Sequence, residues 1–132
     1  MNKIYKKNKF LVWGVVILVI IIGVSIYNKE TKVPGELDEF ASCINDSGAK
    51  FYGTFWCEHC QNQKDVFATS AKYLPYIECS NANGQGATLT CRNANIEGYP
   101  TWEFADGTRE SGELTLEFLA KKTSCKLPGQ DN

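Results

Sequence analysis

"FYGTFWCEHCQNQ", residues 51–63, carries the strongest structural signal in this sequence. It places two cysteines, Cys57 and Cys60, close together and directly after an aromatic run. The run over residues 49–55 has the length and the aromatic content of a buried strand. No proline or glycine interrupts residues 58–73, which predicts a helix over that range. The sequence therefore predicts a strand that leads directly into a helix at the cysteine pair.

A cysteine at the start of a helix has distinctive chemistry. Free backbone N–H groups and the helix dipole favour negative charge there, so we expect the thiolate of Cys57 to be stabilised. Cys60 lies one turn further on the same face, close enough to attack a mixed disulfide on Cys57. His59, when protonated, favours the reduced pair and makes the disulfide a stronger oxidant, whereas Glu58 opposes the thiolate. We therefore predict Cys57, Cys60 and His59 as catalytic residues.

The rest of the C-terminal part alternates between helix and strand signals. Apolar residues at helical spacing, followed by Gly48 as a stop, predict a helix over residues 36–47. Asp106-Gly107 between two strand-like runs predicts a hairpin over residues 101–112. The other expected elements are a strand over residues 76–79, a short helix over 88–95 and a last helix over 114–124. The order α-β-α-β-α-β-β-α predicts an α/β fold.

The apolar side chains of these elements are expected to form the core rather than a ligand site. They are Leu37, Phe40, Ala41 and Ile44 of the first helix, Val66, Phe67 and Ala71 of the second, and the aromatic residues Phe51, Tyr52, Phe55, Trp102 and Phe104.

The N-terminal part predicts a membrane anchor. Residues 10–27 carry no charge, and an 18-residue helix is about 27 Å long, close to the thickness of the hydrocarbon layer. The lysines before it place the N-terminus in the cytoplasm and the C-terminal part on the far side. We expect a cytoplasmic basic stub (1–9), a transmembrane signal-anchor helix (10–27), a linker (28–35), a folded α/β domain (36–127) and a tail (128–132). A cleaved signal peptide is the alternative, but the apolar run is longer than such peptides need.

Charge and cysteine usage agree with this division. Residues 1–30 hold five lysines and one glutamate, whereas residues 31–132 hold nine basic and 14 acidic residues, a pattern that gives no support for nucleic-acid binding. All six cysteines lie in the part expected to be exported, where an even number indicates disulfides. If Cys57 pairs with Cys60, three connectivities remain for the other four. Those four are Cys43, Cys79, Cys91 and Cys125.

Two motifs resemble those of the thioredoxin-fold family. "WCEHC" (56–60) is similar to its Trp-Cys-x-x-Cys motif, and "GYPT" (98–101) is similar to its cis-proline loop. The resemblance covers about residues 36–125 and implies a thioredoxin-like fold with a central mixed sheet. It also implies a cis Pro100 against the cysteines, Trp56 beside them, and backbone bonds from Tyr99 to an extended substrate. These three residues are the expected substrate-binding residues.

A narrower resemblance is to the thioredoxin-like domain fused to bacterial vitamin K epoxide reductase homologues. It rests on "FYGTFWCEHCQNQKDVF", "YIECS", a cysteine 12 residues later, and "GYPTWEF". It implies that the domain receives oxidising equivalents from a membrane enzyme and passes them to exported proteins. Because this chain carries one predicted span, we expect that quinone-linked partner to be a separate protein. The resemblance also favours a Cys79–Cys91 disulfide, which leaves Cys43 with Cys125.

Two positions depart from the family patterns. Glu58 stands where the narrower family usually has proline, which removes a residue suited to the first helical turn. Phe51 stands where many thioredoxins carry a buried acid, so proton transfer to Cys60 needs water or another group. Both departures affect the redox potential rather than the type of chemistry.

Three other roles for the cysteines fit the sequence less well. Zinc binding by Cys57, His59, Cys60 and Cys79 or Cys91 lacks the second close pair of ligands that zinc sites usually show. A structural disulfide in a non-catalytic binding module does not explain the tryptophan or the proline loop. A redox relay through Cys79 and Cys91 needs exposed, reactive thiols.

We therefore expect a membrane-anchored, extracytoplasmic thiol–disulfide oxidoreductase of the cell membrane. It donates disulfides to exported proteins and needs no cofactor or metal. The alternatives are a reductase or isomerase of the same fold, or a binding module.

Overall fold

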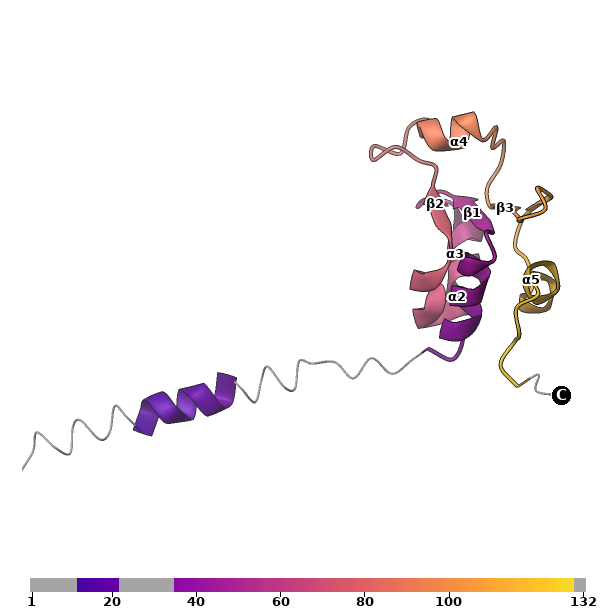
Figure 1. The fold of residues 1–132 in the computed structure, drawn as a ribbon. Coiled ribbons are helices and arrows are strands. Elements are labelled where there is room, and N and C mark those ends of the chain that lie inside the picture. The colour runs from indigo at the N-terminus through magenta and orange to yellow at the C-terminus, as the bar shows by residue number, and fades with distance from the viewer. Residues whose placement is uncertain (1–11, 22–34, 130–132) are drawn as a thin grey trace, which may run out of the picture. The chain divides into compact units, whose positions relative to one another are not determined.

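The computed structural model describes residues 12–21 and 35–129 of the 132-residue chain (Figure 1). The chain divides into two units, Met1–Val33 and Pro34–Asn132, which are described separately. In the first unit, residues 12–21 form a helix, drawn in indigo in Figure 1. No helix among the described residues is long and apolar enough to cross a membrane.

Several of the expected N-terminal and C-terminal segments lie outside the described residues. The predicted span over residues 10–27 extends beyond the described helix at both ends, and the stub over 1–9 lies wholly outside. Of the linker over 28–35, only Gly35 is described, and the tail over 128–132 is described as far as Gly129.

The second unit is built on a four-stranded sheet with the order β2-β1-β3-β4. The strand β1 (Lys50–Gly53) pairs in parallel with β2 (Tyr76–Glu78). On its other side β1 pairs antiparallel with β3 (Thr101–Glu103), which pairs antiparallel with β4 (Arg109–Ser111). This mixed sheet within an α/β domain fits a thioredoxin-like fold.

The helices follow the predicted order. They are α2 (Asp38–Asp46), α3 (Glu58–Phe67), the 3-10 helix η1 (Ala68–Tyr73), α4 (Leu89–Asn93) and α5 (Leu116–Thr123). Figure 1 shows α4 beyond the end of the strands. The prediction of a single helix over residues 58–73 was wrong in one respect, because α3 stops at Phe67 and the chain continues as η1. The break lies at Ala68, whose positive φ of 47° ends the α-helical path.

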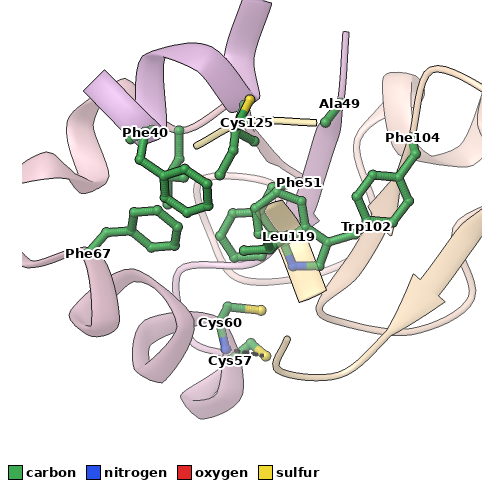
Figure 2. Packing of buried hydrophobic residues seen from close by; sticks show 13 residues of the cluster. Phe40, Ala49, Phe51, Cys57, Cys60, Phe67, Trp102, Phe104, Leu119 and Cys125 are labelled. Carbon is green, nitrogen blue, oxygen red and sulfur yellow. Dashed lines mark hydrogen bonds between the residues drawn. The ribbon is translucent and has the colours of Figure 1, made fainter. Parts of the chain in front are cut away.

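Aromatic packing holds the helices against the sheet. The rings of Phe51 and Trp102 on neighbouring strands are stacked, with centroids 4.5 Å apart, and the rings of Phe40 and Phe67 are stacked at 6.0 Å. Figure 2 shows these rings in one cluster, with Cys57 and Cys60 at its edge. The cysteine pair is therefore attached directly to the core.

Two residues expected in the core are on the surface. Phe55 is 52% exposed, because β1 ends at Gly53 and Phe55 lies in the turn that leads to Cys57. Val66 is 50% exposed, because the buried face of α3 is formed by Cys60, Gln63 and Phe67.

Two disulfides are present in the second unit. Cys43 of α2 is bonded to Cys125, with their Cα atoms 5.8 Å apart. Ser124, in the left-handed conformation, ends α5 and turns the chain so that Cys125 is buried against the core. The second disulfide joins Cys79 and Cys91 across the loop between β2 and α4.

Candidate active site

Cys57 and Cys60 are free thiols at the start of α3. Cys57 is the N-cap residue of this helix, and its Sγ accepts a hydrogen bond from the backbone N–H of Cys60 at 3.3 Å (dashed in Figure 2). A hydrogen bond from a helix N-terminus favours negative charge on the sulfur. Cys57 is 8% exposed and Cys60 is 0% exposed, so the sulfur that an incoming thiol can reach is that of Cys57.

Cys60 lies in an apolar environment that disfavours its charged form. Burial raises the pKa of its thiol to about 12, and the neighbouring Cys57 sulfur also acts in this direction. The backbone of Thr54 and the ammonium of Lys64 oppose this rise. The pair thus combines an outer sulfur at a helix N-terminus with an inner thiol that stays protonated.

Of the three expected substrate-binding residues, Trp56 directly precedes Cys57 in the chain and contacts Tyr99. Trp56 is 57% exposed, and its indole N–H donates to Ser80 Oγ at 3.0 Å. Its ring meets the ring of Tyr99 edge to face, at a centroid distance of 6.2 Å. The peptide bond between Tyr99 and Pro100 is cis, which is the isomer that the resemblance implied. The exposed indole of Trp56, the residue before Cys57, is therefore held by Ser80 and Tyr99.

His59 points to a carboxylate that the sequence analysis did not identify. Its Nδ1 lies 2.6 Å from Glu113 Oε1, and Asn62 Nδ2 donates to the same oxygen at 3.2 Å. These hydrogen bonds, that of His59 first, hold the pKa of Glu113 below its usual value. Glu113 and His59 are 54 residues apart in the chain, so no local pattern could have indicated their contact.

A buried amide fixes the segment that carries Glu113. Gln63 Nε2 donates to the carbonyl oxygen of Leu114 at 3.2 Å, and the N–H of Leu114 donates to Gln63 Oε1 at 2.7 Å. Gln63 is buried, and these two bonds attach α3 to the chain before α5. The position of Glu113 beside the cysteine helix follows from this attachment.

The residues of the zinc alternative are not brought together. Cys79 and Cys91 are bonded to each other and have no free thiol to offer. Within residues 12–21 and 35–129, no group of three or more His, Cys, Asp or Glu side chains is arranged to hold a metal ion.

Gly53 leaves space for the buried thiol. A Cβ atom added to Gly53 would lie 2.8 Å from Tyr76 Cε2 and 3.0 Å from Cys60 Sγ, closer than packed atoms allow. The tyrosine ring and the sulfur of Cys60 therefore approach the same point of β1. This packing explains why a strand residue is a glycine here.

We expect Gly53→Ala to lower the free energy of unfolding by roughly 2 kcal/mol, because overpacking a core typically has this effect. Urea unfolding followed by fluorescence measures the change. Gly98→Ala is the matched control, since an added Cβ at Gly98 has no neighbour within 4 Å. Equal stability of the two variants would contradict the close packing at Gly53.

Comparison with known proteins supports a redox assignment. No family model matches the chain. The chain is similar to the thiol-disulfide oxidoreductase LTO1 of Arabidopsis thaliana, with 43% identity over 91 residues. The match covers 66% of this chain and 24% of that protein, so the chain spans about a quarter of the relative's length. The similarity supports the assignment of this protein as an oxidoreductase enzyme and a relationship to a thiol redox family.

Proposed function

We propose that this protein is a membrane-anchored thiol–disulfide oxidoreductase that donates disulfides to exported proteins through Cys57 and Cys60. The observation that carries the proposal is the arrangement of this pair. Cys57, the less buried of the two, lies at a helix N-terminus, Cys60 is fully buried one turn further on, and the exposed Trp56 directly precedes Cys57. The similarity to a thiol–disulfide oxidoreductase supports the same chemistry.

The reaction begins with the pair oxidised. A substrate thiolate attacks Cys57 Sγ, the Cys57–Cys60 bond breaks, and its electron pair passes to Cys60 Sγ, which then takes up a proton. The second thiol of the substrate, as thiolate, then attacks the substrate sulfur that is bonded to Cys57 and displaces the Cys57 thiolate. The substrate loses two electrons and gains a disulfide, and the pair is left as two reduced sulfurs.

Three features of the site are suited to a protein substrate. The exposed indole of Trp56 and the half-buried ring of Tyr99 that it contacts would offer an apolar surface to a substrate near Cys57. The backbone of Tyr99, before the cis Pro100, would hold an extended substrate chain. His59, when protonated, adds positive charge near the outer sulfur and favours the reduced pair.

The location and the partner are part of the proposal. The uncharged stretch over residues 10–27 and the lysines before it support an anchor with the second unit outside the cytoplasm. The two disulfides of the second unit are typical of an oxidising compartment. A vitamin K epoxide reductase-like or other quinone-linked membrane protein would re-oxidise the pair.

The reduction potential of the Cys57–Cys60 pair tests the direction. We would titrate the full-length chain against glutathione buffers and follow the fraction oxidised. A value between about −120 and −200 mV places the protein with oxidants and isomerases. A value near about −270 mV, as for thioredoxin, favours a reductase. If the pair does not exchange at all, the result would favour the alternative of a non-catalytic binding module.

A further inference from the structure

A half-buried lysine, Lys64, lies beside the buried face of the cysteine helix. Lys64 follows Cys60 by four residues in α3, so both side chains lie on the same face of the helix. Its Nζ is 3.3 Å from the centroid of the Tyr76 ring. Desolvation lowers the pKa of Lys64, whereas the nearby Glu78 and Cys60 act to raise it. The ammonium therefore lies over an aromatic ring, and two nearby groups favour its charge.

The ring under the lysine is fixed in place. The hydroxyl of Tyr76 donates to Glu78 Oε2 at 2.9 Å. The other oxygen of Glu78 accepts backbone N–H bonds from Ser80 at 2.8 Å and from Phe55 at 3.3 Å. The contacts of Gly53 bring the same ring to the side of the Cys60 sulfur. The ammonium of Lys64 thus lies on the Tyr76 ring, and that ring lies close to the buried thiol of Cys60.

A positive charge close to the Cys60 sulfur assists the exchange reaction. When a thiolate attacks Cys57, a negative charge develops on Cys60, in surroundings that strongly disfavour it. The residue at the position of the buried acid of thioredoxins is Phe51, which cannot exchange a proton. The neighbouring Cys57 disfavours a negative charge on Cys60, whereas the backbone of Thr54 and the ammonium of Lys64 favour it. Lys64 is the charged side chain among these groups.

We propose that Lys64, held on the Tyr76 ring, is a positioning residue that stabilises the departing Cys60 thiolate during disulfide exchange. The inference rests on the proposed function. In the step itself, the bond between the substrate sulfur and Cys57 Sγ forms while the Cys57–Cys60 bond breaks. The charge of the substrate thiolate moves to Cys60 Sγ beside the ammonium, and a proton from water then neutralises the sulfur. No electron passes to Lys64.

The test is the rate at which dithiothreitol reduces the oxidised pair in the full-length chain. Lys64→Met keeps much of the apolar stem on the ring and removes the charge, and we expect it to slow reduction roughly tenfold. Lys64→Arg keeps the charge and should restore most of the rate. Lys72→Met is the matched control, because Lys72 also lies over a ring, that of Tyr73 at 4.8 Å, but on the exposed surface of η1.

Two further readouts separate this role from a structural one. The rate at which iodoacetamide alkylates Cys57 in the reduced protein should change less than twofold in Lys64→Met. The midpoint of urea unfolding should match that of the Lys72→Met control.

The outcomes are distinct. Reduction of Lys64→Met within twofold of wild type would overturn the inference, as would a slow Lys64→Arg variant or an equal slowing by Lys72→Met. If the unaltered protein does not react with dithiothreitol, the proposed function itself fails, and the role of Lys64 fails with it.

Discussion

Replacing Cys57 with serine is expected to abolish thiol–disulfide exchange by the full-length chain. Cys57 is the sulfur that a substrate can reach, whereas Cys60 is fully buried. A serine hydroxyl forms no disulfide, so the variant has no oxidised form to donate. The measurement is the oxidation of a reduced dithiol peptide by the pre-oxidised protein, followed by mass spectrometry.

The Cys60→Ser variant should behave differently, because it keeps the reachable sulfur and loses the resolving one. We expect it to accumulate mixed disulfides with substrates through Cys57, visible as bands on a non-reducing gel that disappear on reduction. Full exchange activity in Cys57→Ser would contradict the mechanism. A Cys60→Ser variant without trapped species would show that Cys57 is not the entry point.

The double replacement of Cys79 and Cys91 by alanine is the control for the alternative of a redox relay. Both cysteines are buried and bonded to each other, so an incoming thiol cannot reach them. We expect the variant, if it remains folded, to reduce and oxidise the Cys57–Cys60 pair at the wild-type rate with small thiols. A loss of that reaction in a folded variant would favour the relay.

The order of elements was predictable from the sequence because each element carries its own local signal. Helical spacing of Phe40, Ala41 and Ile44 indicated α2, and all three are buried. Asp106-Gly107 indicated the hairpin, and Gly107 has the positive φ that this turn requires.

The errors in the core arose where the chain leaves a regular element. Phe55 and Val66 are apolar, but their exposure depends on where β1 ends and on how α3 is rotated about its axis. The rotation of α3 is determined by contacts with distant segments, including the bonds between Gln63 and Leu114. Spacing within one helix does not contain that information.

The residues of the candidate site also fall into two groups, those indicated by a local motif and those identified only by contacts between distant segments. The motif that contains Cys57 and Cys60 could be identified from the sequence because it is contiguous and lies at a strand–helix junction. Lys64, Glu78 and Glu113 were missed, because their significance depends on contacts between α3 and segments elsewhere in the chain. Phe51, at a position where many thioredoxins carry a buried acid, was the one indication that water or another group must serve Cys60.

Removing the Cys43–Cys125 disulfide is expected to produce the largest loss of stability. The bridge closes a loop of sequence separation 82, and restricting the unfolded chain over such a loop is worth about 4 kcal/mol. It also joins α2 to the end of α5, two helices that contact each other. A loss of this size is a large fraction of the free energy of unfolding of a small domain.

The measurement is urea unfolding of a Cys43→Ala, Cys125→Ala variant, with Cys57 and Cys60 replaced by serine in all proteins to prevent disulfide exchange. Removal of the Cys79–Cys91 bridge in the same background is the comparison. That bridge spans a separation of only 12, for which the same restriction is worth about 3 kcal/mol. If the loss for the long bridge is below about 1 kcal/mol, its ends remain close in the unfolded chain without it. In that case contacts between α2 and α5, rather than the covalent link, would account for the stability of this part of the domain.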